Sequence, residues 1–248
     1  MPTVLSLLAH PDDAEFLCAG TLIRLRQEHG FEVHIASMTP GDCGAVAQGA
    51  LEISRLRREE GARAAALIGG TFHCLEERDL LVFYQDATLE KVTRLLRDIR
   101  PNVVLTHSSS DYMLDHEMTS VITRASCFAA PIPNFLEARD LGPTLPSIPH
   151  LYYCDPIEGK DALGNPVVPG FCVAVSKDVM DIKTDMLACH ASQRAWLHKH
   201  HGMDQYTLSM RDFGSQRGRE AGCAFAEGFR QHLGHSYPQD NILVKLLG

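Results

Sequence analysis

The first half of the chain alternates short apolar runs of strand type with longer segments whose apolar residues recur at helical spacing. The strand-type runs are residues 3–8, 32–38 and 102–107, and the helical segments are residues 14–29, 49–68 and 86–99. A strand–helix alternation of this kind requires parallel strands joined by right-handed crossovers that cover the sheet with helices. We therefore predict an α/β fold built on a parallel sheet.

The second half of the chain is less regular. Five prolines between residues 129 and 150 predict a long connection over the surface. We predict strands near 150–154 and 167–175, and helices near 116–128, 177–200 and 204–232. Since no repeat, low-complexity segment or linker separates the two halves, we predict a single domain over residues 1–248.

Composition excludes several classes of protein. The chain carries 31 acidic against 23 basic side chains, a formal net charge of −8, which argues against nucleic acid as a partner. No stretch approaches the ~20 apolar residues that span a bilayer. The N-terminus lacks the features of a secretory signal, and the eight cysteines are scattered without a CxxC pair. We therefore expect a cytoplasmic protein whose cysteines are reduced.

Ionisable residues gather where two predicted strands end. Residues 3–8 run into His10, Asp12 and Asp13, and residues 102–107 are followed by a segment that reaches His116. Ligands of open α/β sheets bind at the carboxyl ends of strands. Two histidines and one aspartate would hold a catalytic zinc and leave a position for water, while a second aspartate could accept the water's proton. From spacing alone, a solvated acidic turn with a helix-capping aspartate fits equally well.

A resemblance to a known family adds to this pattern. The segment Ala9-His10-Pro11-Asp12-Asp13-Ala14-Glu15, followed by Gly20-Thr21, resembles the signature of the PIG-L/LmbE-like zinc-dependent de-N-acetylases. Weaker similarities continue through residues 39–42, 57–60 and 67–69, the loop to His116, and residues 183–193. The resemblance implies a Rossmann-like three-layer α/β/α fold with a mostly parallel sheet, and it implies Zn²⁺ as the cofactor.

The resemblance also implies roles for individual residues. His10, Asp13 and His116 would be the zinc ligands, and Asp12 would be the general base. Arg57 would lie near the substrate pocket, although a solvated helix arginine paired with Glu60 is an equal alternative. The further candidates for substrate contacts are Asp42, Tyr112, His190, His200 and His201. Trp196 and Tyr206 could line a sugar-binding pocket, but packing in the core is the favoured interpretation for both. His107, at a strand end, is interpreted as a core residue or as a support for the ligands.

One motif departs from the family. Where the family usually has His-Pro-Asp-His, this chain has Met113-Leu114-Asp115-His116, and methionine has no proton to give to a leaving amine. Asp115 is then expected only to orient His116. The missing acid could be His190, a residue of the 198–201 cluster, or Tyr112; alternatively, protonated Asp12 could return its proton. A third interpretation is loss of hydrolysis with retention of metal binding.

The leading functional hypothesis is a zinc-dependent hydrolase that removes an N-acyl group, most plausibly acetyl, from an amino sugar or related small molecule. An amidase acting on a thiol conjugate or a secondary-metabolite precursor is an alternative within enzymes. A non-catalytic metal- or sugar-binding protein is the alternative from another class, and Met113 motivates it. Since members of the family often form oligomers, the resemblance also implies a homo-oligomer of unspecified size.

Overall fold

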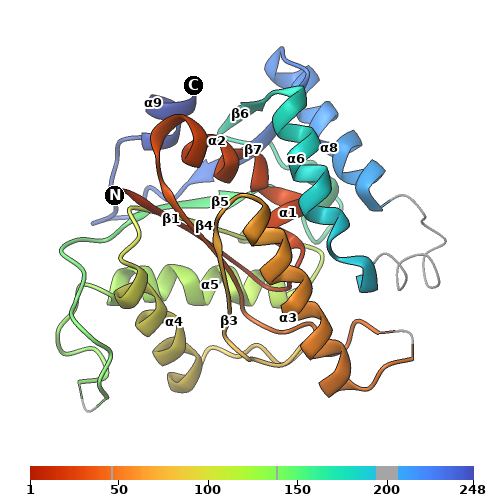
Figure 1. Cartoon of the computed structure of the whole chain (residues 1–248). Coiled ribbons are helices and arrows are strands. Elements are labelled where there is room, and N and C mark those ends of the chain that lie inside the picture. Colours follow the sequence, from red (N-terminus) through yellow and green to blue (C-terminus); the bar gives the residue numbers. More distant parts are fainter. Residues whose placement is uncertain (46, 138, 194–205) are drawn as a thin grey trace.

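A seven-stranded sheet forms the centre of the computed structural model, which describes residues 1–45, 47–137, 139–193 and 206–248 (Figure 1). The strands are β1 (Thr3–Leu8), β2 (Glu32–Ser37), β3 (Thr71–Cys74), β4 (Val103–Thr106), β5 (His150–Cys154), β6 (Phe171–Val175) and β7 (Phe225–Gln231). Their order in the sheet is β3-β2-β1-β4-β5-β7-β6. The first five pair in parallel, whereas β7 is antiparallel to both of its neighbours. The predicted mostly parallel sheet is confirmed.

Helices cover both faces of this sheet, as the three-layer prediction requires (Figure 1). The helices are α1 (Asp13–Leu17), α2 (Ala19–His29), α3 (Ala50–Leu67), α4 (Asp86–Ile99), α5 (Leu114–Ala129), α6 (Lys177–Ala188), α8 (Tyr206–Ala221), α9 (Ile242–Leu247) and the short 3₁₀ turn η1 (Ile157–Gly159). Helices α4 and α5 pack on one face, and the other α-helices contribute to the core on the opposite face. Within the described ranges, no helix is both long and apolar enough to cross a membrane.

Strand β1 shows why the first apolar run is so uniform. Val4 and Leu8 pack into the hydrophobic core on one face of the sheet, while Leu5 and Leu7 pack into the core on the other face. All four side chains are fully buried. A strand at the centre of a parallel sheet has helices on both sides, so both of its faces must be apolar.

The prediction of one helix over residues 204–232 is wrong. Helix α8 ends at Ala221, and residues 225–231 form β7 inside the sheet. Strand β7 could not be recognised from its sequence because Glu227 and Gly228 are unusual in a buried strand. Glu227 is paired with Lys183, and a Cβ atom at position 228 would collide with the carboxylate of Asp155. Both residues are therefore explained by tertiary neighbours that local patterns do not show.

Other boundaries also differ from the predictions. The helix predicted over 14–29 is two helices that meet at Cys18, and the strand predicted over 167–175 begins only at Phe171. Helix α6 ends at Ala188, well before the predicted end at residue 200; residues 194–200 lie outside the described part of the chain. Strand β3 is a short, partly exposed edge strand whose residues give little periodic signal.

A buried ion pair joins helices α6 and α2 to strand β7 of the sheet. Lys183 of α6 donates to the carboxylate of Glu227 on β7 at 2.5 Å, and each side chain is only 2% exposed. The same carboxylate accepts hydrogen bonds from the backbone N–H groups of Gly20 and Thr21 in the first turn of α2, at 2.8 and 2.7 Å. A buried charge is tolerated when it is paired and its remaining lone pairs are satisfied, as they are here.

Replacing Lys183 by methionine should leave the Glu227 carboxylate buried without its cation. We expect the free energy of unfolding, measured by urea denaturation, to fall by about 3–5 kcal/mol. The matched control is Lys177→Met on the same helix, because Lys177 pairs with Asp181 at 3.0 Å but is exposed. This control should change stability by less than ~1 kcal/mol. Equal losses in the two variants would contradict a special contribution of the buried pair.

Candidate functional site

The candidate site lies where the strand order of the sheet reverses. From β1 the chain proceeds to β2 on one side, while β4 pairs with the other side of β1. Open α/β sheets bind ligands at such a switch point, beyond the carboxyl ends of the strands. A cavity of about 570 Å³ opens at this place, and His10, Asp12, Asp13 and His116 line it. This volume is in the range of small-molecule sites, roughly 300–1,000 Å³.

The three predicted zinc ligands lie together. Nδ1 of His10 is 3.3 Å from Oδ2 of Asp13, and Nε2 of His116 is 3.6 Å from the same oxygen. Two ligands of a tetrahedral zinc, each about 2.0–2.1 Å from the metal, are separated by roughly 3.4 Å. The spacing of these nitrogen and oxygen atoms therefore fits a zinc ion held by two imidazoles and one carboxylate.

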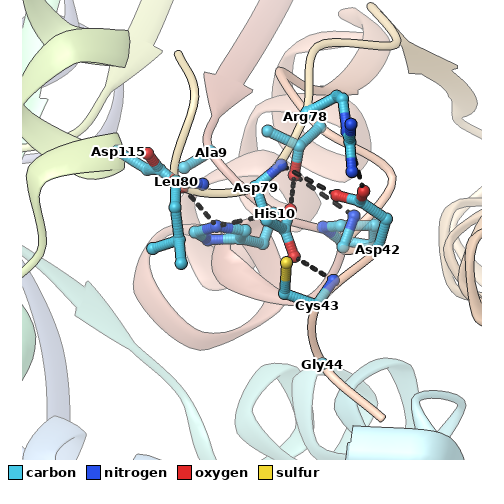
Figure 2. A network of polar contacts seen from close by, with 12 residues as sticks. Ala9, His10, Asp42, Cys43, Gly44, Arg78, Asp79, Leu80 and Asp115 are labelled. Carbon is cyan, nitrogen blue, oxygen red and sulfur yellow. Dashed lines mark hydrogen bonds and ion pairs between the residues drawn. The ribbon is translucent and has the colours of Figure 1, made fainter. Parts of the chain in front are cut away.

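Carboxylates outside the cluster orient both imidazoles. Nδ1 of His116 is hydrogen-bonded to Asp111 at 2.9 Å, which leaves Nε2 directed toward Asp13. Nε2 of His10 lies 3.4 Å from Oδ2 of Asp115, which leaves Nδ1 for a metal (Figure 2). Such partners fix the ring and tautomer of histidine ligands. The expectation that Asp115 orients His116 is corrected, because adjacent residues on a helix point in different directions and Asp115 faces His10 instead.

The charges around His10 favour a cation. Burial by itself lowers the pKa of His10, but its contacts with the Asp115 and Asp13 carboxylates outweigh burial and raise the pKa to about 10. Burial by itself raises the pKa of Asp13, yet the imidazoles of His116 and His107 hold it well below its usual range. A site that binds a proton this firmly in a cluster of imidazoles and carboxylates also has the donor set for a divalent metal ion.

His107 packs against the predicted ligands His116 and Asp13. Its ring stacks on that of His116 with centroids 3.8 Å apart, and its Nε2 lies 3.1 Å from Oδ2 of Asp13. The backbone N–H of Ala9 also donates to this nitrogen at 2.9 Å. Burial, aided by the neighbouring His116, lowers the pKa of His107 to about 4 and keeps the ring neutral near pH 7. His107 thus contacts two of the proposed ligands.

Asp12 adopts a strained backbone conformation, and its side chain contacts other residues than that of Asp13 does. Its φ of 107° lies in the left-handed region, which non-glycine residues occupy at a cost of roughly 1–3 kcal/mol and mostly at functional sites. Its Oδ1 is 3.3 Å from Nη2 of Arg57, and its Oδ2 accepts a hydrogen bond of 2.6 Å from Tyr206. Burial raises the pKa of Asp12 more than Arg57 lowers it, so this carboxylate takes up a proton more readily than an exposed one.

Arg57 is a buried part of the site. It is 3% exposed, donates to the carbonyl of Pro11 at 2.6 Å and lines the cavity. The alternative of a solvated arginine paired with Glu60 is wrong, because Glu60 instead accepts hydrogen bonds from the backbone and side chain of Ser192. Arg57 therefore connects the loop after β1 with helix α3.

Of the candidates for substrate contacts, Tyr112 and Asp42 differ in whether they line the cavity. Tyr112 lines the cavity and meets the ring of His116 edge-on, with centroids 5.4 Å apart. Asp42 does not line it: its carboxylate accepts from the backbone of Asp79 at 2.8 Å and from Arg78, so its role is to hold this loop (Figure 2). A substrate contact at Asp42 stays a prediction.

Of the candidate histidines in the C-terminal half, the structure describes His190 but not those between residues 198 and 201. His190 is buried beside Glu15, at 3.5 Å from its carboxylate, and does not line the cavity. His200 and His201 lie outside the described residues, as do His198 and Trp196. Met113, at the departure from the family motif, lines the cavity.

Two functional contacts escaped the sequence analysis. Asp111 orients His116 although it lies outside the quoted motif, and Tyr206 bonds to Asp12 across 194 residues of sequence. Asp111 could have been suspected from its position five residues before a metal-type histidine, on the loop between a strand and a helix. Nothing in the sequence near Tyr206 points to Asp12.

Fold and site together define a Rossmann-like α/β protein with a candidate metal centre at the switch point of its sheet. A family model described as PIG-L, GlcNAc-PI de-N-acetylase, matches residues 5–127, which include all three candidate ligands. The chain belongs to the PIG-L family.

Similar proteins of known description include deacetylases and hydratases. The 4-oxalmesaconate hydratase of Pseudomonas putida KT2440 is 25% identical over 91% of this chain and 85% of its own length. The N,N′-diacetylchitobiose deacetylase of Pyrococcus horikoshii superposes with a TM-score of 0.78 at 24% identity, covering 96% of this chain and 87% of that one. A 4-carboxy-2-hydroxymuconate hydratase of Pseudomonas putida KT2440 gives a TM-score of 0.76 at 21% identity, covering 98% and 100%.

Gly41 leaves the space that the Arg57 guanidinium occupies. Its φ is 74°, and a Cβ atom there would collide with the Arg57 guanidinium. Gly41→Ala should therefore lower the free energy of unfolding by roughly 2–5 kcal/mol, from backbone strain plus overpacking. The control is Gly164→Ala: its φ is 81°, but no atom of the described residues lies within 4 Å of the added Cβ.

Chemical denaturation of both variants measures this difference. Gly164→Ala should show only the backbone strain of about 1–2 kcal/mol. A Gly41→Ala variant no less stable than Gly164→Ala would contradict the tight packing of Arg57.

Proposed function

We propose that the protein is a zinc-dependent hydrolase that removes an N-acyl group, in the first place acetyl, from an amino sugar or a related small molecule. The observation that carries this proposal is the placement of Asp12. Its carboxylate lines the same cavity as the His10–Asp13–His116 cluster, but its own side-chain contacts are with Arg57 and Tyr206. One aspartate is thus available to the metal and its neighbour to a proton.

The roles follow from this division. His10, Asp13 and His116 would hold the zinc, which supplies Lewis acidity and lowers the pKa of a bound water to about 7. Asp12 accepts the proton of the attacking water, and its raised pKa suits this task. Arg57, fixed by the Pro11 carbonyl, keeps the Asp12 carboxylate in place.

The walls of the cavity favour a neutral substrate. Away from the predicted ligands, the described lining includes the aromatic or aliphatic side chains of Phe16, Leu80, Tyr112, Met113, Ile157, Tyr206 and Phe213. It also includes the carboxylates of Asp79 and Glu158, which repel an anionic substrate. Of the described lining residues, Arg57 is the single arginine or lysine, and Asp12 and Pro11 already engage it. Apolar rings pack well against the faces of a sugar or another uncharged body, whereas a polyanion needs free cations.

A hydratase is the second candidate. It is favoured by the 25% identity with the 4-oxalmesaconate hydratase over 91% of the chain and by Met113, which cannot protonate a leaving amine. Addition of water to a carbon–carbon double bond would use the same activated water and the same base. The substrates named in the two Pseudomonas putida matches are unsaturated polycarboxylates, for which the described walls offer no free arginine or lysine.

A substrate panel separates these functions. The zinc-loaded protein is incubated with N-acetylated amino sugars, N-acylated thiol conjugates and unsaturated polycarboxylic acids, and proton NMR follows acetate release and loss of vinyl protons. We expect acetate from an amino sugar and unchanged unsaturated acids. Hydration without acetate release would establish the hydratase instead. Release from thiol conjugates alone would favour the amidase, and bound zinc without any turnover would favour a binding protein.

Replacing either of the neighbouring aspartates, Asp12 or Asp13, by asparagine should lower activity, but only one of the two substitutions should lower the zinc content. Asp12→Asn should lower amide turnover by about 10²–10⁴-fold while zinc content, measured by mass spectrometry after dialysis, stays at the wild-type level. Asp13→Asn should lose zinc as well as activity, because it removes a charged ligand. An active Asp12→Asn protein, or one that loses its zinc, would contradict the assigned role of Asp12.

A further inference from the structure

The phenol of Tyr206 lies beside the proposed base. Its hydroxyl donates to Oδ2 of Asp12 at 2.6 Å, while Arg57 faces the other oxygen, Oδ1, at 3.3 Å. The ring stacks on Phe16 with centroids 6.0 Å apart and planes 29° apart, which limits its movement. Tyr206 is the first residue of α8 and lines the cavity. A residue that lines the cavity therefore carries a hydroxyl that is hydrogen-bonded to the proposed base.

The cavity needs a proton donor that the sequence motif does not supply. Met113 lines the cavity at the position where the family has histidine, and a thioether has no proton. The other lining hydroxyls in the described residues belong to Tyr112 and Ser209. Tyr112 is 65% exposed and packs on His116, and neither hydroxyl contacts Asp12 in the described part of the chain. His190 lies outside the cavity wall.

We propose that Tyr206 is the acid that protonates the leaving amine, in a relay with Asp12. This role rests on the proposed N-acyl hydrolysis. Water attacks the carbonyl carbon and gives one proton to Asp12. As the carbon–nitrogen bond breaks, its electron pair stays on nitrogen, which takes the phenolic proton of Tyr206. The Tyr206 oxygen then receives the proton from Asp12.

The relay returns both residues to their starting states. Asp12 is again a carboxylate and Tyr206 a phenol, and the products are a carboxylic acid and a free amine. Burial and the adjacent Asp12 raise the pKa of Tyr206 well above its usual range, so the phenol is protonated before each turnover. The short hydrogen bond supplies the path for the return of the proton.

Tyr206→Phe tests this role because phenylalanine keeps the ring that packs on Phe16 and removes only the hydroxyl. With the zinc-loaded protein and the amide that the wild type cleaves, we expect kcat to fall about 10²-fold or more with little change in KM. Hydrolysis of p-nitrophenyl acetate should fall less than ~5-fold, because p-nitrophenolate leaves without a proton. Zinc affinity, measured by isothermal titration calorimetry, should be unchanged.

The matched control is Tyr152→Phe, which removes another largely buried tyrosine hydroxyl, one bonded to Asn241 at 3.2 Å and remote from the cavity lining. It should lose about 1 kcal/mol of stability and no activity. Met113→His in the Tyr206→Phe background introduces a new acid and should restore part of the amide rate.

Three results would overturn the proposal. Amide turnover within about threefold of wild type in Tyr206→Phe would place the acid elsewhere. Equal losses on the amide and the ester, together with weaker zinc binding, would reduce Tyr206 to a structural residue. A wild-type protein that cleaves no amide would refute the proposed function and this role together, whereas an active wild type with an unaffected Tyr206→Phe variant refutes this role alone.

Discussion

The parallel pairing of β1 with β4 is the constraint on which the site depends. It sets side by side the ends of two strands whose following segments carry His10 to Asp13 and His107 to His116. Asp13 and His107 lie 94 residues apart in sequence and 3.1 Å apart in space because of this pairing. Both strands are buried in the sheet, so their ends are rigid supports for groups that must keep distances of a few ångströms.

Charge compensation organises the layers around this pairing. Near the site, the carboxylates of Asp111, Asp115 and Asp13 surround two imidazoles, so each nitrogen has a defined partner or a defined direction. Between helix α6 and strand β7, Lys183 and Glu227 bury opposite charges. Buried charges are stable only when such partners are present, and removing one partner leaves the other uncompensated. The same rule makes Arg57 and Tyr206 essential to the position of Asp12.

Much of the fold and the inner part of the site could be predicted from the sequence. Strands β1 and β4 are short runs buried on both faces, and such runs can be recognised without knowledge of their partners. The loop from His10 to Asp13 could be recognised because its residues are contiguous. By contrast, β7 could not be recognised, since Glu227 and Gly228 are accommodated by Lys183 and Asp155 from other elements. The interpretation of Asp115 failed for a related reason: residue order on a helix does not reveal which neighbour a side chain faces.

By itself, the sequence determined the layered α/β architecture and the strand ends at which polar groups gather, and it predicted the His–Asp–His set that the structure brings together. Periodicity and contiguous motifs carry this information because they act over a few residues. Only the tertiary structure decided that Asp111 and Asp115 serve different imidazoles, that Arg57 is buried and that Tyr206 bonds to Asp12. These contacts depend on side-chain directions and on how the helices pack on the sheet. The methionine at position 113 is a sequence fact, but the hydrogen bond between the Tyr206 phenol and Asp12, the proposed base, is a fact of packing.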